Sequence, residues 1–532
     1  MESETSPLRG HAEEGEDIDN QRPTTKSELL GWYCYAWACE PFIVSAVGTY
    51  VPILLEQLAR ENGFRLDDPS QPCIPVSSPN DPQNPLPPTP GPPTDPSRGP
   101  NKCVVPFFGK MIDTSSLALY TFSLSVLVQT LVVISMSGAA DRGKFRKKLL
   151  VAFAVIGATS TCLFLAVNRD RYYLASFLAV MSNSAFGAVS VCGNAYLPVL
   201  VSNHPDVKQV SEQEDISRTR SLLTGRISGT GVAIGYFAAF LVQVATMVLV
   251  KLTGSTTLSL EMAIFAVGLW WLVFQIPISL LLRSRQGPPL PHKPQGGVTR
   301  ITWEYIKYGW HTLLMTLKEA REMKDVAIFL VGWFIVSDGA TTINSAAVLF
   351  ARAELQMSPP SLAIIGVLVV LSGMAGAMLV PRVVQPWLDR KLARPSPVNG
   401  MLFVIVVAAV IPFYGILGFY LKSLGLRHEW EMFFLAAWYG FALGGLNTTA
   451  RAVFSMLIPK GKESTFFSLF SVTDKGSSVI GPAITGLITD RTHNIRYTFY
   501  FLFAMLIIPL AVFSLLDMDR GQQEAETLES ID

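Results

Sequence analysis

The sequence predicts an all-α polytopic membrane protein with twelve transmembrane helices in two pseudo-symmetric halves of six. Half of the 532 residues are hydrophobic and only 16% are charged, a composition unlike that of soluble globular chains. Apolar runs of about 20 residues, the length that crosses a hydrocarbon core of about 30 Å, recur along the chain. The net charge of +1 says nothing by itself about nucleic acid. The basic residues sit in short loops between apolar runs rather than on one soluble face, so nucleic-acid binding is not expected.

Twelve segments of the chain meet this requirement of length and apolarity. The first thirty residues are acidic and have no basic stretch ahead of an apolar one, so we expect no cleavable signal peptide. The expected spans are residues 32–56, 116–138, 149–167, 173–197, 224–250, 260–282, 326–349, 361–381, 399–421, 431–458, 466–488 and 497–516.

Basic residues indicate which side of the membrane the loops occupy. Lys and Arg cluster after spans two, six and eight, in DRGKFRKK, RSRQGPPLPHKPQGGVTR and DRKLAR, and short basic loops stay in the cytosol. Both termini are therefore predicted to be cytosolic. The expected divisions are an acidic disordered tail at 1–31, a six-helix half at 32–282, a cytosolic connection at 283–325, a six-helix half at 326–516 and an acidic tail at 517–532.

The longest loop on the other side of the membrane covers residues 57–115. Between Pro69 and Pro100 it holds 13 prolines, which disfavour regular structure and leave few apolar residues for a core. We expect this loop to be extended and mobile. Cys73 and Cys103 flank most of the proline tract in a compartment that permits oxidation, so they are candidates for a disulfide bond. The compartment and the number of cysteines do not decide whether this bond forms.

Internal repetition supports two related halves. Asp141 in DRGK and Asp389 in DRKL lie 248 residues apart, and Arg226 and Lys475, each in the fifth span of its half, lie 249 apart. Two matches at almost one offset indicate a duplicated six-span unit. Two such units joined by a long cytosolic connection give the architecture of the major facilitator superfamily, whose substrate site lies between the halves.

The stretch SGAADRGKFRKK after span two is similar to the signature of that superfamily between spans two and three. Gly138, Asp141, Arg142, Gly143 and Arg146 occupy the expected positions. The resemblance implies that this loop latches the cytosolic gate, with Asp141 contacting basic groups and the cytosolic end of span eleven. The spacing and charge of these residues also allow an alternative, in which the basic cluster only fixes the orientation of the spans in the membrane.

Five longer stretches resemble the fungal autophagy-related protein 22 family of vacuolar amino-acid effluxers. They are EPFIVSAVGTYVPILLEQLARENG (40–63), GNAYLPVL (193–200), GRISGTGVAIGY (225–236), GWFIVSDGATTINS (332–345) and FFSLFSVTDKGSSVIGPAITGLITD (466–490). The likeness implies a multi-pass protein of the vacuole membrane that works by alternating access. Its implied substrates are amino acids from autophagic degradation, leucine and other neutral ones among them, moved from lumen to cytosol.

Proton symport would suit an acidic lumen, but the sequence departs from the superfamily here. Proton-coupled members often carry an arginine in span four, and none lies between Tyr172 and Val201. Two other functions stay open, a membrane nutrient receptor without turnover and a transporter of another small solute. No cofactor, metal site or enzyme activity is expected, because the six histidines are scattered without ligand spacing.

Charged residues inside spans are costly and normally face protein or water, so they mark candidate sites. Glu40 lies about 12 Å into span one and Asp338 about 18 Å into span seven by helical rise. Each follows a Gly-Trp pair and precedes Pro or Gly, so we interpret them as equivalent residues that face each other across the cavity. They are candidates for binding an ammonium group or carrying a proton. Alternatively, each pairs permanently with an inter-half basic residue such as Arg226 or Lys475.

Arg451 in span ten is the candidate for a substrate carboxylate, because a guanidinium presents paired donors. The alternative is that it snorkels toward the cytosolic end of the span. Asn194 and Asn447 are weaker candidates, since asparagines in spans more often join neighbouring helices. Asp474 and Lys475, further candidates for inter-half charges, are adjacent and diverge by about 100° on one helix, so each should find a partner on another span.

Pro41 follows Glu40 inside span one. Proline cannot donate a backbone hydrogen bond, which frees the carbonyl of Trp37 and favours a kink. In lipid, a freed carbonyl is tolerable only where another helix or a water-filled cavity supplies a partner. We therefore expect Glu40 and Pro41 to face a polar interior.

Overall fold

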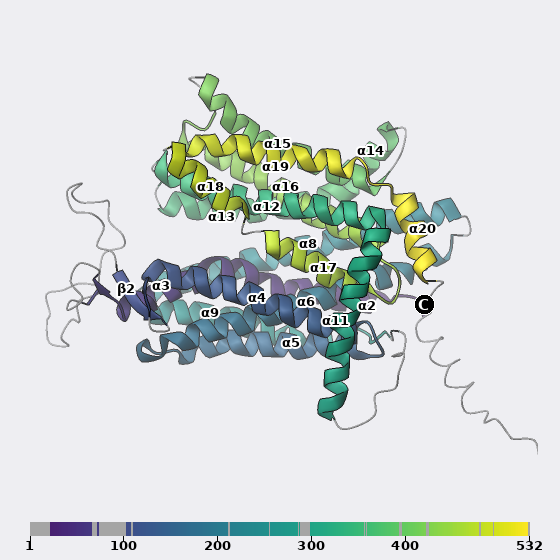
Figure 1. The fold of residues 1–532 in the computed structure, drawn as a ribbon, viewed down its shortest axis with the longest axis horizontal. Coiled ribbons are helices and arrows are strands. Elements are labelled where there is room, and N and C mark those ends of the chain that lie inside the picture. Colours follow the sequence, from purple (N-terminus) through teal and green to yellow (C-terminus); the bar gives the residue numbers. More distant parts are fainter. Residues whose placement is uncertain are drawn as a thin grey trace, which may run out of the picture.

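Long helices run side by side in two layers, and they account for nearly all of the chain that the computed structural model describes (Figure 1). Apart from one small sheet, the predicted all-α fold is confirmed. The described residues are 22–65, 72–73, 103–107, 110–210, 213–254, 256–285, 287, 298–355, 357, 359–392, 396–421, 425–477, 480–492 and 494–529.

One layer is the N-terminal half of the chain, which ends at residue 282. Its helices are α2 (Lys26–Pro41), α3 (Val51–Glu61), α4 (Thr114–Ala140), α5 (Phe145–Cys162), α6 (Tyr172–Ser202), α7 (Pro205–Lys208), α8 (Gln213–Leu252), α9 (Thr257–Val273) and α10 (Gln275–Leu281), with 3-10 turns at Leu163–Ala166 and Arg169–Arg171. The apolar composition of these helices suits burial against one another and against lipid.

The second layer is the C-terminal half, which α11 (Val298–Glu322) connects to the first. It consists of α12 (Lys324–Ala353), α13 (Pro359–Leu379), α14 (Gln385–Lys391), α15 (Pro397–Tyr420), α16 (Glu429–Met456), α17 (Glu463–Ser477), α18 (Ile480–Thr492), α19 (Thr498–Phe513) and α20 (Met518–Glu529), with a π-helical turn at Val380–Val384 and a 3-10 turn at Ile495–Tyr497. In Figure 1, α8 and α17 lie between the layers and α11 runs across the helix axes at the end where the C-terminus lies.

Ten of the helical segments in the described ranges are long and apolar enough to span a membrane. The two expected spans outside that set are 431–458, which α16 covers, and 466–488, which is divided between α17 and α18. The prediction of a multi-span helical membrane protein is confirmed, and the count of twelve spans stays a prediction.

The helix of span one changes character at Pro41. The α2 helix ends at this residue, and a π-helical segment, Phe42–Tyr50, leads into α3. The indole Nε1 of Trp270 donates a 3.0 Å hydrogen bond to the carbonyl of Trp37. The carbonyl that Pro41 leaves without its helical donor therefore finds its partner on α9, which satisfies a polar group in an apolar setting.

The loop at residues 57–115 has more structure at its edges than the proline count predicts. The α3 helix continues to Glu61, and strands β1 (Phe64–Arg65), β2 (Cys103–Phe107) and β3 (Lys110–Asp113) form an antiparallel sheet in the order β1-β2-β3. The apolar sequence of β2 explains the difference, because Val105 is fully buried. The expectation of an extended, mobile chain at 74–100 lies outside the described residues.

Both predicted tails are shorter than expected. Thr25 caps α2 by accepting a hydrogen bond from the backbone of Glu28, so the helix begins within the predicted 1–31 tail. At the other end, α20 occupies most of the predicted 517–532 tail, and Arg520 donates two hydrogen bonds, 2.7 and 2.8 Å long, to Asp325 at the start of α12. Each helical segment forms an ion pair with a distant part of the chain, Glu28 with Arg285 and Arg520 with Asp325.

Candidate functional site

A small polar cavity lies between the two halves. Its walls come from α2 and α8 of the N-terminal half and from α16 of the C-terminal half. The lining residues are Tyr35, Ala36, Glu40, Val232, Tyr236, Asn447 and Arg451. Three of the five predicted substrate or proton candidates, Glu40, Asn447 and Arg451, are thus brought together from opposite halves.

Polar contacts cross the halves at this cavity. The amide of Asn447 donates a 2.9 Å hydrogen bond to the Tyr236 hydroxyl. Glu40 and Arg451 line the same cavity as Tyr35 and Tyr236. Arg451 lines the cavity, and the alternative that it snorkels toward the cytosolic end of the span stays open.

Glycines let the surrounding helices approach α2 closely. A Cβ atom at Gly235 of α8 would lie 3.1 Å from the Cβ of Glu40, and one at Gly193 of α6 would lie 2.3 Å from the Tyr35 ring. Small residues at helix contacts permit such close packing in membranes. The glycines of the GRISGTGVAIGY and GNAYLPVL stretches therefore let α8 and α6 pack closely around the cavity.

Asp338 lies elsewhere, against the start of α18. Its side chain is 1% exposed, and its Oδ1 accepts a 3.0 Å hydrogen bond from the backbone N–H of Gly481. The hydroxyl of Thr342 donates to the same oxygen. The structure therefore does not bring Asp338 to the cavity that Glu40 lines, and the predicted encounter of the two carboxylates across the cavity is corrected.

The other candidate residues that sequence analysis identified inside spans do not line this cavity. Asp474 accepts a 2.6 Å hydrogen bond from Ser337 on α12, so its partner is on another span as predicted. The side chain of Lys475 lies outside the described part of the chain, and Arg226 on α8 is exposed. Asn194 is 6% exposed, and its Oδ1 has no hydrogen-bond partner among the described residues.

The loop after span two connects the halves at the end where α2 begins and α20 lies. Asp141 accepts hydrogen bonds from the backbone N–H groups of Ser464 and Thr465, 2.6 and 2.7 Å long, at the start of α17. Arg146 contacts Asp141 at 3.1 Å and Glu463 at 2.8 Å. Carboxylates are stabilised at helix N-termini. We call these five residues the latch.

Burial affects the electrostatics of the latch. Asp141 is 3% exposed and Arg146 is 6% exposed. Burial raises the pKa of the Asp141 carboxyl, and Arg146 beside it opposes that rise. The arrangement is a buried ion pair whose partners come from both halves, so breaking it leaves uncompensated charge.

All these inter-half contacts lie between the cavity and the end with the termini. Besides the latch, Ser228 of α8 donates to the carbonyl of Thr448 on α16 at 3.2 Å, and Arg382 donates to Thr230 at 2.8 Å. Toward the other end, α18 packs on α12 and α19 of its own half. The halves are held together on the side of the termini.

The family model described as "Vacuole effluxer Atg22 like" matches residues 24–526 of this chain. The chain belongs to this family. The Atg22-like chain is 50% identical over 590 aligned residues to autophagy-related protein 22 of Yarrowia lipolytica, an alignment that covers 96% of this chain and 99% of the relative. It is 42% identical over 536 residues to autophagy-related protein 22 of Saccharomyces cerevisiae, covering 97% and 96% of the two chains.

Solved structures show the fold of the Atg22-like chain to be that of the major facilitator superfamily. The proton:xylose symporter XylE is similar with a TM-score of 0.57 at 10% identity, over 97% of this chain and 99% of that one. A bacterial homologue of the iron transporter ferroportin in an outward-facing state has a TM-score of 0.56 at 12% identity, over 92% and 98%. The predicted superfamily fold is confirmed.

The connecting helix α11 of the Atg22-like chain crosses α4 next to the latch. A Cβ atom at Gly138 would lie 2.6 Å from the Cα of Gly309, so the crossing requires glycine. Trp310 donates a 3.0 Å hydrogen bond to Ser135, and Arg142 donates to the hydroxyl of Tyr308. The structure therefore places Gly138 and Arg142 at a contact with the central connection.

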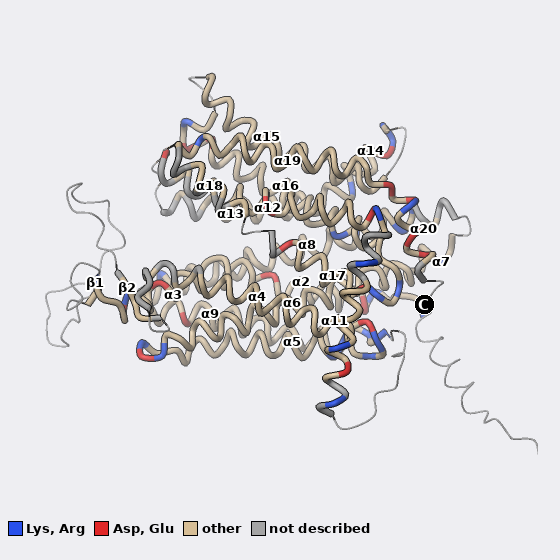
Figure 2. The backbone as a smooth tube through the Cα atoms, in the orientation of Figure 1, with Lys and Arg blue, Asp and Glu red and all other residues tan. Residues whose placement is uncertain are grey.

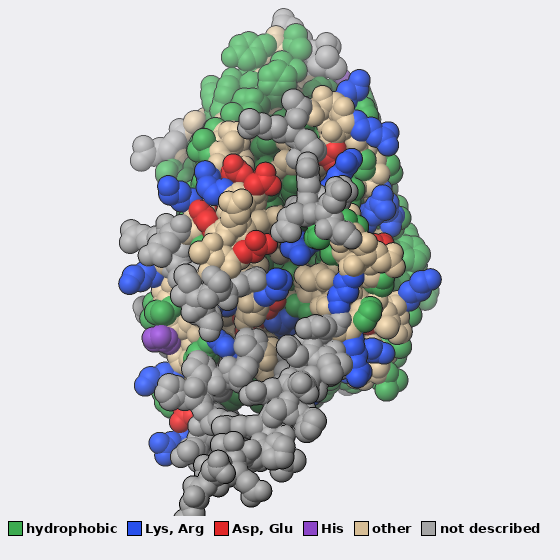
Figure 3. Space-filling view, turned by 90° about the vertical axis from the view of Figure 1, so that its right-hand side faces the viewer, with side chains coloured by type: hydrophobic (Ala, Val, Ile, Leu, Met, Phe, Trp, Pro, Cys, Tyr) green, Lys and Arg blue, Asp and Glu red, His purple; other side chains and the backbone are tan. Residues whose placement is uncertain are grey.

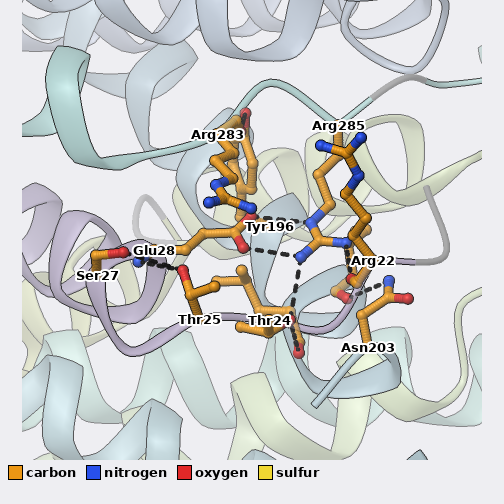
Figure 4. Close-up of polar contacts among 11 residues, drawn as sticks. Arg22, Thr24, Thr25, Ser27, Glu28, Tyr196, Asn203, Arg283 and Arg285 are labelled. Atoms are coloured by element: carbon orange, nitrogen blue, oxygen red, sulfur yellow. Dashed lines mark hydrogen bonds and ion pairs between the residues drawn. The ribbon is translucent and has the colours of Figure 1, made fainter. Parts of the chain in front are cut away.

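A second buried ion pair, which sequence analysis missed, supports the start of α2 (Figure 4). Glu28 is fully buried, and its two oxygens accept hydrogen bonds of 2.9 and 2.8 Å from Arg285. Arg285 also donates to the carbonyl of Arg22 and to the Thr24 hydroxyl. Sequence analysis assigned Glu28 to a disordered tail, and its place three residues after a helix cap was the available signal.

Gly481→Ala is expected to destabilise the Atg22-like protein by about 1–3 kcal/mol, because overpacking a close contact forces neighbours apart. The new Cβ would lie 1.9 Å from the Thr342 hydroxyl and 2.8 Å from Asp338 Oδ1. Thermal unfolding of purified protein in lipid nanodiscs measures this. Gly366→Ala on α13 is the matched control, because a Cβ there meets nothing within 4 Å, and equal unfolding temperatures for the two variants would contradict the prediction.

Proposed function

We propose that this protein exports amino acids from the vacuole lumen to the cytosol by alternating access of its two halves. The observation that carries the proposal is the inter-half cavity in which Glu40 lies with Arg451 and Asn447. A free amino acid has an ammonium and a carboxylate group, so opposite charges in one cavity match its two ends. Membership of a family described as vacuole effluxers supports the compartment and the direction.

The lining of the cavity combines charged, polar and apolar groups. Tyr35, Ala36 and Val232 supply apolar surface beside the charged groups. Leucine and other neutral amino acids would place their charged groups at Glu40 and Arg451 and leave an uncharged side chain against this surface.

The distribution of basic residues supports an orientation with both termini in the cytosol. Lys and Arg concentrate at the end of the bundle where the C-terminus lies (Figure 2), and basic side chains are spread over that face (Figure 3). Short loops with Lys and Arg are retained on the cytosolic side. In this orientation, the latch closes the cytosolic side and the cavity receives substrate from the lumen.

Proton symport would use the acidic lumen, with Asp338 as a candidate carrier. Asp338→Asn is expected to lower proton-driven efflux several-fold with protein abundance unchanged, because asparagine still accepts the Gly481 hydrogen bond but cannot release a proton. Efflux of labelled leucine from vacuolar vesicles, with and without a proton gradient, measures this. Loss of folded protein, or full stimulation by the gradient, would refute the assignment.

The decisive functional experiment is labelled leucine flux in liposomes that contain the purified protein, with a panel of competing solutes. We expect flux above that of empty liposomes and competition by neutral amino acids. Saturable leucine binding without flux would favour a nutrient receptor. Competition only by sugars or peptides would assign another solute, and either result would reject the proposed function.

A further inference from the structure

Glu261 is a buried carboxyl group without a cationic partner. It lies on the second turn of α9, at the end of the N-terminal half opposite the latch, and is 6% exposed. Within the described part of the chain, its side chain makes no hydrogen bond or ion pair. No cation among the described residues pairs with this carboxylate, and the missing counter-charge disfavours its ionised form.

A second carboxylate faces the same turn of α9. The hydroxyl of Thr257 donates to Oε1 of Glu61 at the end of α3, and Gln57 donates to that hydroxyl at 2.6 Å. Thr257 lies four residues before Glu261, so the two side chains share one face of α9. Glu61 is the charged group that acts on Glu261.

The cations near this end are engaged elsewhere or exposed. Arg60 pairs with Glu56 at 2.7 Å, with both side chains largely exposed, and Arg169 donates to the backbone carbonyl of Glu61. Lys251 at the end of α8 is exposed to solvent. In Figure 2, acidic segments lie where α3 ends and α9 begins. Two carboxylates without a neutralising cation cannot both ionise readily.

We propose that Glu261, with Glu61 beside it, is a proton-binding site at the end of the bundle opposite the termini. A proton from bulk solution adds to an oxygen of Glu261, which converts two facing negative charges into one. This site is separate from the cavity of Glu40 and Arg451. The inference goes beyond the proposed function, because it holds for any solute, and in the proposed orientation the site faces the acidic lumen.

Infrared difference spectroscopy of the full-length protein in lipid nanodiscs tests the proposal through the carbonyl stretch of protonated carboxyl groups. Between about pH 5 and about pH 8, the range above the ordinary glutamate pKa, the wild type is expected to lose this absorption at Glu261. Glu261→Gln should lack that pH-dependent component, because glutamine resembles the protonated form but does not titrate. Glu56→Gln, the exposed control on α3, should retain it.

Glu61→Gln provides an independent arm. Removing the neighbouring negative charge should move the Glu261 titration to lower pH, because less repulsion opposes its ionisation. The proposal is overturned if the wild type and Glu261→Gln give the same pH-dependent spectra. If Glu261→Gln does not fold, equal titration midpoints in the wild type, Glu61→Gln and Glu56→Gln overturn it. No transport is measured, so failure here is distinct from failure of the proposed function.

Discussion

Neutralising either charge of the central cavity is expected to lower amino-acid transport by about 10-fold to 100-fold. Glu40→Gln and Arg451→Gln each remove one of two charged contacts to a zwitterion. A hydrogen bond to a charged group contributes about 1.5–3 kcal/mol, and every 1.4 kcal/mol corresponds to a tenfold change. Initial rates of labelled leucine flux below saturation, normalised to the amount of reconstituted protein, measure the effect.

The double variant separates substrate binding from support of the fold. If Glu40 and Arg451 only hold α2 to α16, each single variant loses folded protein and the double variant recovers it, because a lone buried charge is what destabilises. If they bind substrate, the single variants fold normally and the double variant transports no better. Arg60→Gln, at an exposed arginine, is the matched control. Wild-type flux in both single variants would exclude their role in binding.

The internal repeat in the sequence identified Glu40 and Asp338 as charged residues inside spans, but it did not predict which residues surround them. Glu40 and Asp338 each follow a Gly-Trp pair in the first span of their half, yet Glu40 lines the inter-half cavity and Asp338 binds the backbone of Gly481. Whether a residue faces the cavity depends on helix rotation and on neighbours from other helices. Equivalence between halves therefore identifies candidate residues without showing which of them meet.

Local chemistry allowed better predictions than long-range pairing did. The freed carbonyl of Trp37 follows from Pro41 alone, although the donor, Trp270, is 233 residues away. Glu28 was missed because its partner Arg285 is 257 residues away, and an acidic segment without a visible partner resembles a solvated tail. Glu261 lies inside an expected span, so the rule for intramembrane charges could have identified it.

Asp141→Ala is expected to open the latch and to reduce transport by impairing the switch between conformations. The substitution removes a partner of Arg146 and leaves two backbone N–H groups at the start of α17 without their acceptor. Breaking a buried ion pair costs about 3–5 kcal/mol. In the proposed alternating access, the latch forms in the conformation that is closed on this side, and that cost shifts the equilibrium toward the opposite conformation by about 100-fold or more.

The thiol of Cys192 on α6 is a native reporter of this opening. It is fully buried and lies within range of the charges of Asp141 and Arg146, so separation of the halves at the latch should expose it. We expect faster alkylation of Cys192 in Asp141→Ala than in the wild type, quantified by mass spectrometry. Cys162, a half-buried thiol at the far end of α5, should react at the wild-type rate. Faster reaction of both thiols would indicate unfolding, and an unchanged rate at Cys192 would show that Asp141 does not hold the halves together.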